Sequence, residues 1–201
     1  MGPANKGCKC STCHANFGDC PGHYGYLSLA LPVFNVGYFT TILEILKCIC
    51  KSCSRILLEE KLYKDFLRKM RNPKLEALRK CELAKKIVKK CTTLTSSNKS
   101  MKCSRCGYLN GSVKKAVSML GILHYRVKSK DAGMVSEDLR APYNVSNDIL
   151  NPFRVLSLFK RMTDEDCELL FLSDRPDNLI ITNVAVPPIA IRPSVIMDGS
   201  Q

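Results

Sequence analysis

The stretch Cys10-Ser-Thr-Cys-His-Ala-Asn-Phe-Gly-Asp-Cys-Pro-Gly-His23 determines how the rest of this chain is interpreted. It holds two pairs of potential ligands, Cys10 with Cys13 and Cys20 with His23, and two residues separate the members of each pair. Two tight turns of this spacing supply the four nitrogen and sulfur ligands of tetrahedral zinc. Because no coordination position stays open, the stretch predicts a structural zinc site. The alternative is a set of ordinary buried or redox-active cysteines.

A second site is predicted from two further CxxC pairs, Cys50 with Cys53 and Cys103 with Cys106. The glycine that follows the last pair favours the tight turn of a zinc knuckle. Together the pairs give a four-cysteine site closed by a long insertion. Two alternatives stay open here: one pair has no metal, or Cys48 replaces a neighbouring ligand. The cofactors predicted from the sequence are therefore two structural Zn²⁺ ions.

The composition of the 201 residues is globular, with 45% hydrophobic and 24% charged residues. No run approaches the roughly 18 apolar residues of a membrane span, and the N-terminus lacks the apolar core of a signal peptide. We therefore expect a soluble intracellular protein without a membrane partner. In such a chain twelve cysteines indicate metal sites rather than disulfides.

Hydrophobic periodicity predicts an α+β fold, zinc-stabilised and mostly helical, with short strands and two zinc knuckle sites. The expected elements follow the chain in order. They are a strand over 24–31 ending at Pro32, a helix over 36–47 capped by Asn35, and a helical insertion over 59–90 broken at Asn72-Pro73. Next we expect a polar loop from Cys91, strand character over 113–130, a loop over 128–144, and helices over 152–161 and from Thr163. The last expected elements are a turn at 173–176, a strand over 179–182 and an extended proline-rich stretch from Val186.

The insertion has apolar stripes at Leu62, Phe66 and Leu67 and at Leu75, Leu78, Leu83, Ile87 and Val88. We expect three segments within one domain. Residues 1–34 form the first zinc loop and strand, 35–130 a basic helical region enclosing the second zinc site, and 131–201 a helical pair with the proline-rich segment.

The net charge of +13 is concentrated in the middle of the chain. Residues 47–130 carry 23 Lys or Arg against 5 Asp or Glu, and the remainder carries 8 against 13. This predicts a polyanionic partner, nucleic acid, held through its backbone without sequence reading; the alternative is a set of solvated helix faces. The candidate contacts are Lys64, Arg68, Lys69, Lys85, Lys86, Lys89, Lys114 and Lys115.

No catalytic residues are predicted. The chain has no glycine-rich phosphate loop and no carboxylate cluster suited to magnesium. Asp164-Glu165-Asp166 is interpreted as the first turn of a helix, where the helix dipole favours acidic residues. His124 and Cys167 are interpreted as packing residues.

Several motifs carry a family resemblance, and they occur in order along nearly the whole chain. They are Cys20-Pro-Gly-His-Tyr-Gly25, Leu46-Lys-Cys-Ile-Cys-Lys-Ser-Cys53, Cys103-Ser-Arg-Cys-Gly-Tyr-Leu-Asn-Gly111, Asn151-Pro-Phe-Arg-Val-Leu-Ser-Leu-Phe-Lys-Arg-Met162 and Val186-Pro-Pro-Ile-Ala-Ile-Arg-Pro-Ser-Val195. Together they resemble the N-terminal clamp region of the largest subunit of multisubunit RNA polymerases, most of all the polymerase III type. The Asp174-Arg-Pro and Leu179-Ile-Ile-Thr runs are similar to plant members.

This resemblance implies zinc ligands at the same eight positions. It also implies a mobile nuclear clamp that closes over DNA and the RNA–DNA hybrid during transcription of small RNA genes. Other polymerase subunits, especially the second-largest, are the implied partners. The magnesium loop Asn-Ala-Asp-Phe-Asp-Gly-Asp of such subunits is absent from this sequence, so Mg²⁺ belongs to the complete subunit. The segment alone is expected to be inactive within a nucleotidyltransferase complex.

The cysteine pairs also allow two other functions. One is a stand-alone zinc-stabilised module that binds nucleic acid without catalysis. The other is a ubiquitin-ligase type of zinc domain, which requires interleaved ligand pairs; the roughly fifty, largely helical residues between the pairs of the second site argue against it.

Overall fold

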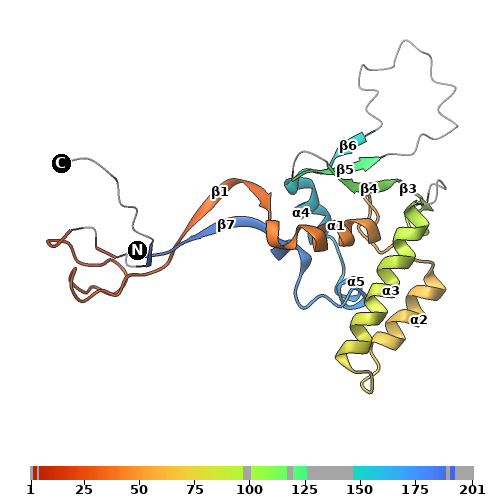
Figure 1. The fold of residues 1–201 in the computed structure, drawn as a ribbon, viewed down its shortest axis with the longest axis horizontal. Helices are drawn as coiled ribbons and strands as arrows, with labels where there is room; N and C mark the ends of the chain where they lie inside the picture. Colours follow the sequence, from red (N-terminus) through yellow and green to blue (C-terminus); the bar gives the residue numbers. More distant parts are fainter. Residues whose placement is uncertain are drawn as a thin grey trace, which may run out of the picture. The chain divides into compact units, whose positions relative to one another are not determined.

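The computed structural model of the chain describes residues 2–3, 5–96, 101–116, 120–125, 147–188 and 191–192. It contains two compact units, of which the first comprises Met1–Leu31 with Thr182–Gln201 and the second Pro32–Ile181. Helices and strands both contribute to the described part (Figure 1). The predicted loop over 128–144 lies outside the described residues, as do residues 189–190 and 193–195 of the proline-rich stretch. The three sequence segments given above stay a prediction.

The first unit consists of the metal loop and most of a two-stranded ribbon. Strand β1 (Gly25–Phe34) pairs with β7 (Ile180–Val186), and Ser28 Oγ donates a hydrogen bond to Asn183 Oδ1 over 2.9 Å. The strand prediction was wrong at its end, because β1 continues past Pro32 to Phe34. In a two-stranded sheet each strand has an open edge, so the missing N–H of a proline there costs no ladder bond.

The second unit contains the main hydrophobic core. A short 3₁₀ turn, η1 (Val36–Tyr38), leads into α1 (Phe39–Cys48), and Asn35 Oδ1 accepts a hydrogen bond from Gly37 N over 3.1 Å. The predicted cap and helix are thus confirmed. The other helices are α2 (Glu60–Met70), α3 (Ala77–Ser96), α4 (Pro152–Lys160) and α5 (Asp164–Leu169). Ile42, Leu46, Ile87 and Phe159 are fully buried among them.

The helical insertion is confirmed as α2 and α3, and its break falls at the predicted Asn72-Pro73. The predicted loop from Cys91 was wrong, because α3 continues to Ser96. Cys91 is fully buried, and Thr92 Oγ1 donates to the Val88 carbonyl one turn back over 2.8 Å. The polar side chain is therefore satisfied within the helix, which removes the local competition that usually favours a loop.

The inner stripe of α3 differs from the prediction at one residue. Leu78 is 70% exposed. It precedes the buried Ile87 by nine residues, and at 3.6 residues per turn this places the two on opposite faces of the helix.

Short strands complete the second unit. A hairpin of β2 (Met101–Lys102) and β3 (Leu109–Asn110) encloses the last CxxC pair. The antiparallel sheet β4-β5-β6 consists of Ser112–Lys115, Ile122–Tyr125 and Asn147–Ile149 (Figure 1). It confirms strand character within 113–130, whereas β6 had not been predicted. The fold is therefore mixed, with helices and strands both substantial.

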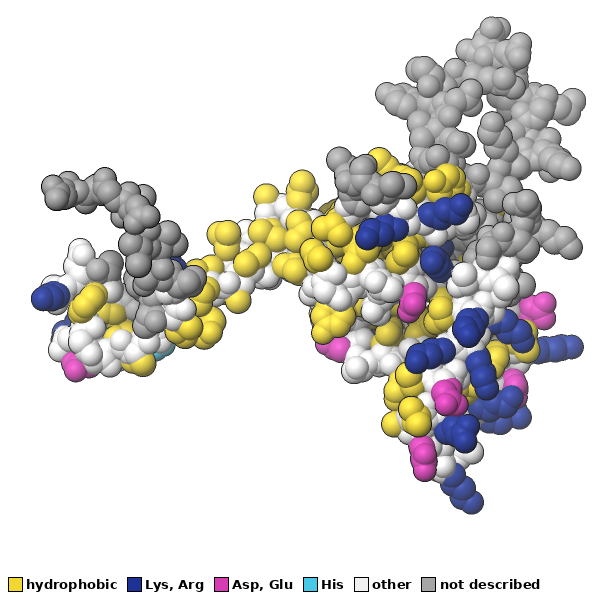
Figure 2. Space-filling view, viewed as in Figure 1, with side chains coloured by type: hydrophobic (Ala, Val, Ile, Leu, Met, Phe, Trp, Pro, Cys, Tyr) yellow, Lys and Arg dark blue, Asp and Glu magenta, His cyan; other side chains and the backbone are white. Residues whose placement is uncertain are grey.

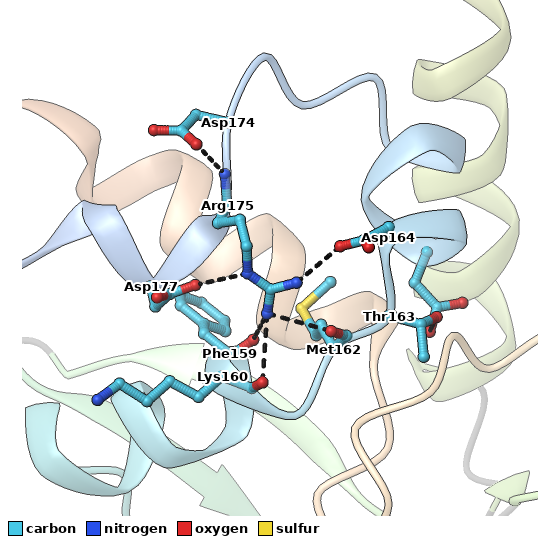
Figure 3. A network of polar contacts seen from close by, with 9 residues as sticks. Phe159, Lys160, Met162, Thr163, Asp164, Asp174, Arg175 and Asp177 are labelled. Atoms are coloured by element: carbon cyan, nitrogen blue, oxygen red, sulfur yellow. Dashed lines mark hydrogen bonds and ion pairs between the residues drawn. The ribbon is translucent and has the colours of Figure 1, made fainter.

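The turn after α5 carries a polar network around Arg175 (Figure 3). Its Nη2 donates to the carbonyls of Phe159, Lys160 and Met162 at 3.2–3.3 Å, at the C-terminal end of α4. Nη1 contacts Asp164 at 2.9 Å and Nε contacts Asp177 at 3.2 Å. One guanidinium thus joins the end of α4, the start of α5 and the 3₁₀ turn η4 (Pro176–Leu179).

None of the helices in the described part combines the length and apolar character needed to cross a membrane.

Candidate metal centres

The first cluster unites all four predicted residues, Cys10, Cys13, Cys20 and His23, with their ligand atoms within 4.8 Å of one another. The Sγ atoms of Cys13 and Cys20 are 3.6 Å apart, and Cys20 Sγ lies 3.6 Å from His23 Nε2. The second cluster unites Cys50, Cys53, Cys103 and Cys106 in the same way. Its Cys50–Cys106 and Cys53–Cys103 sulfur distances are 3.6 and 3.7 Å.

These distances fit a tetrahedral ion. Bonds of about 2.3 Å to sulfur and about 2.0–2.1 Å to nitrogen place two sulfurs about 3.8 Å apart and a sulfur about 3.6 Å from a nitrogen. A disulfide needs about 2.05 Å between its sulfurs, so the three sulfur–sulfur pairs, at 3.6–3.7 Å, are not disulfides. Both clusters could therefore hold a metal ion.

The three CxxC turns share one backbone design. In each, the N–H of the first cysteine donates to a carbonyl five residues later: Cys10 to Ala15, Cys50 to Arg55 and Cys103 to Tyr108, at 2.8–2.9 Å. The N–H of the residue after the second cysteine donates back to the first cysteine's carbonyl, at 2.8–3.0 Å. That residue has a positive φ each time: His14 at 59°, Ser54 at 61° and Gly107 at 73°.

A left-handed residue at this point folds the chain back on itself, so both cysteine side chains face one ion. Glycine adopts that conformation without strain, which is the signal that the sequence offered at Gly107. His14 and Ser54 gave no comparable signal. The fourth pair, Cys20 with His23, is built differently, with Gly22 at φ 87° between its members.

Cys48 lies outside the second cluster. It is fully buried at the end of α1, and hydrogen bonding with Cys91, together with burial, raises the pKa of its thiol. The geometry thus gives no support to Cys48 as a replacement ligand.

The second cluster is anchored to the helices of its unit by two arginines. Arg55 Nε lies 2.9 Å from Asp166 Oδ2, and Asp166 is fully buried. Arg161 Nη1 donates to the Ser52 carbonyl over 2.9 Å. Sequence reasoning missed these anchors because their partners are more than a hundred residues apart.

The acidic run of α5 does not converge on a metal. Asp164 contacts Arg175, Asp166 contacts Arg55, and Glu165 accepts a hydrogen bond from Tyr63 over 3.3 Å. Within the described residues, the two cysteine-containing groups are the candidate metal sites. The interpretation of the run as a first helical turn is therefore confirmed.

The predicted nucleic-acid contacts fall into separate places. Lys and Arg side chains gather over α2 and α3 (Figure 2). A groove of about 240 Å³ brings Lys69 and Lys86 together with Arg79, over Leu75 and Leu83. Lys64 pairs with Glu60 and Lys69 with Asp65, each at 2.7 Å, and Arg68 is exposed on α2.

Four other predicted contacts lie away from this groove. Lys85 and Lys89 line a different hollow beside Glu44. Lys114 and Lys115 lie on β4, with their ammonium groups 5.3 and 5.5 Å from the ring centroids of Tyr125 and Phe39. The eight cations therefore do not form a single patch.

Comparison with known proteins identifies the family of this chain. All of residues 1–201 match the family model described as RNA polymerase Rpb1, domain 1. The chain therefore belongs to this family of RNA polymerase subunit domains.

The individual relatives described below are subunits of DNA-directed RNA polymerases. The chain is 39% identical over 216 residues to the DNA-directed RNA polymerase III subunit rpc1 of Dictyostelium discoideum, covering 100% of this chain and 14% of that protein. It is 38% identical over 226 residues to the corresponding RPC1 subunit of Saccharomyces cerevisiae, covering 100% and 15%. The archaeal subunit Rpo1N of Methanocaldococcus jannaschii is 29% identical over 204 residues, covering 100% and 13%. The chain thus spans about a seventh of the length of these relatives, and the resemblance to the polymerase III type is confirmed.

Proposed function

We propose that the chain is the N-terminal clamp portion of the largest subunit of a DNA-dependent RNA polymerase III. The observation that carries this proposal is the similarity of 38–39% over the whole chain to subunits of that enzyme. A stand-alone zinc module has no comparable support, since each relative named above is a polymerase subunit.

In this proposal each cysteine cluster binds one structural Zn²⁺. The donor sets, three Cys with one His and four Cys, are those of structural zinc sites, and the distances match tetrahedral bonding. The purified chain should contain two zinc ions, measured by elemental analysis. A content of two iron ions per chain would contradict the assignment.

The clamp role assigns the basic surface to the backbone of DNA and of the RNA–DNA hybrid. Affinity for duplex and hybrid should fall steeply as salt rises and should not depend on sequence, because phosphate contacts release condensed counterions. Fluorescence anisotropy over a salt series tests this expectation. Salt-independent or sequence-selective binding would overturn it.

Catalysis belongs to the complete enzyme in this proposal, and so does Mg²⁺. The purified chain should incorporate no nucleotides on a primed template. Template-directed synthesis by the chain alone would refute the assignment of catalysis to the complete enzyme.

The implied partners are the other polymerase subunits, above all the second-largest, and the implied compartment is the nucleus. Co-expression with that subunit, followed by affinity purification, should recover the pair. A fluorescent fusion should accumulate in the nucleus, and cytoplasmic retention together with failure to recover the pair would count against this placement.

A further inference from the structure

We propose that Asn110 is a positioning residue for the second metal cluster, one that joins its two CxxC turns through a sulfur–amide hydrogen bond. The inference rests on the zinc assignment proposed above. It concerns a residue that is not itself a ligand.

Asn110 ends strand β3, and its side chain is 1% exposed. Its Oδ1 accepts a hydrogen bond from Lys51 N over 2.9 Å. Its Nδ2 lies 3.4 Å from Cys50 Sγ and 3.2 Å from the Tyr108 carbonyl, and donates to both. The amide thus contacts the turn of Cys50 on one side and the turn of Cys103 on the other.

The orientation of this amide follows from its partners. The backbone N–H of Lys51 can only donate, so it requires the amide oxygen. The carbonyl of Tyr108 can only accept, so it requires the amide nitrogen. The N–H groups of Asn110 therefore face Cys50, and a reversed amide would lose these contacts.

The sulfur that Asn110 contacts is a metal ligand and carries negative charge when it coordinates zinc. Cys50 also accepts from Ser52 N over 3.4 Å. Each such donor fixes the direction of the thiolate and offsets part of its charge in a buried setting. Lys51, whose side chain is 5% exposed and donates to the carbonyls of Leu46 and Ile49, adds a buried cation directly after Cys50.

The first cluster has a different arrangement. Its Cys10 accepts from the backbone N–H of Thr12 over 3.4 Å, and among the described residues no side-chain amide contacts a sulfur there. A change at Asn110 should therefore affect one site and leave the other as an internal reference.

The experiment compares the Asn110→Asp and Asn110→Ala variants with the wild-type 201-residue chain. Zinc transfer to a chromophoric chelator is measured at both sites, which are distinguished by the Cys20→Ala background. Loss of an outer hydrogen bond typically lowers metal affinity about 10–100-fold, so release from the second site should accelerate by at least roughly tenfold. Release from the first site should stay unchanged.

Cobalt substitution supplies a readout that a purely structural role would not move. Removing an N–H donor leaves the thiolate more electron-rich, so the sulfur-to-cobalt charge-transfer band should shift to lower energy in both variants. Asn183→Asp, at an exposed asparagine of β7, controls for the added charge. Val113→Ala, at a buried residue of the neighbouring strand β4, controls for lost stability without touching a sulfur.

If Asn110→Asp releases zinc from the second site at the wild-type rate and its cobalt band is not shifted, the inference about Asn110 is overturned. The zinc assignment itself stands in that case, because the wild-type chain still holds two zinc ions. Acceleration equal to that of Val113→Ala, again without a band shift, would overturn the inference as well. A wild-type chain with a single zinc ion that disappears in Cys20→Ala would instead refute the zinc assignment of the second cluster, and the inference with it.

Discussion

At the scale of single residues, Cys20 illustrates how far metal binding and local folding depend on one ligand. Its sulfur lies 3.6 Å from both Cys13 Sγ and His23 Nε2. Cys20→Ala should lose one of two zinc ions and unfold the first metal loop, because structural zinc supplies about 10–16 kcal/mol of apparent binding energy that doubles as folding energy. Zinc content and the melting profile measure this.

The control for Cys20 is Cys8→Ala, which changes an exposed cysteine outside both clusters. That variant should keep two zinc ions. A Cys20→Ala protein with full zinc and an unchanged melting profile would remove Cys20 from the ligand set.

Arg175 stabilises the fold through the hydrogen bonds and ion pairs of its guanidinium group (Figure 3). Arg175→Ala should lower the free energy of unfolding by about 2–3 kcal/mol, since hydrogen bonds to a charged group contribute about 1.5–3 kcal/mol. Arg175→Lys should recover less than half, because an ammonium cannot reproduce the planar fork that reaches both carbonyls and carboxylates. Urea denaturation of the zinc-loaded chain tests both, and full recovery by lysine would contradict the role of geometry.

Tyr63 is the residue for which a pH dependence follows. Burial, with the nearby charges of Asp166 and Glu165, raises the pKa of its phenol. A pKa raised in the folded state gives stability that is present below about pH 10, the unfolded value, and is lost as pH rises through the folded value.

Tyr63→Phe should therefore flatten the alkaline loss of stability, and it should remove the last phenolate step from an ultraviolet absorbance titration. The other six of the seven tyrosines are unchanged in this variant. Loss of an earlier step, with the last step kept, would place the shifted phenol elsewhere.

At the scale of elements, we propose the groove between α2 and α3 as the nucleic-acid contact, because three cations line it against one carboxylate, Glu82. Lys69→Gln with Lys86→Gln should lower the slope of log affinity against log salt by roughly 2, about 1 for each lysine on a phosphate. The pairs Lys85 with Lys89 and Lys114 with Lys115, changed in the same way, should leave the slope near the wild-type value. A reversed pattern would move the interface to α3's other hollow or to β4.

The sequence was most informative where chemistry is local. The spacing of the cysteines predicted both clusters, and Asn72-Pro73 predicted the break between α2 and α3. The length of α3 was underestimated, because the burial of Cys91 depends on a helix packed against it. The roles of Asn110, Arg55 and Arg175 could not be predicted, since each joins segments that meet only after folding.

At the scale of the whole molecule, the two units should depend on metal to different degrees. Among the described residues of the first unit, only Cys10 and Pro188 are buried, whereas the second unit has an extended core. A segment without a core of its own needs a metal to fold.

Chelation should therefore unfold the first unit and leave the helices of the second largely intact. Limited proteolysis should cut within residues 5–31 first, and far-ultraviolet circular dichroism should retain most of its helical signal. Simultaneous loss of both units would show that the core around Ile42 and Phe159 is insufficient without zinc.

The spacing of the ligands also sets an order of events during synthesis on the ribosome. The first cluster is complete once His23 has emerged, but the second waits for Cys106, 83 residues later. At roughly 5–20 residues per second this is a delay of about 4–17 s. Strand β1 waits longer still for its partner β7. The nascent chain thus presents a complete metal loop beside a strand whose backbone N–H and C=O groups stay open to pairing with other chains until β7 is made.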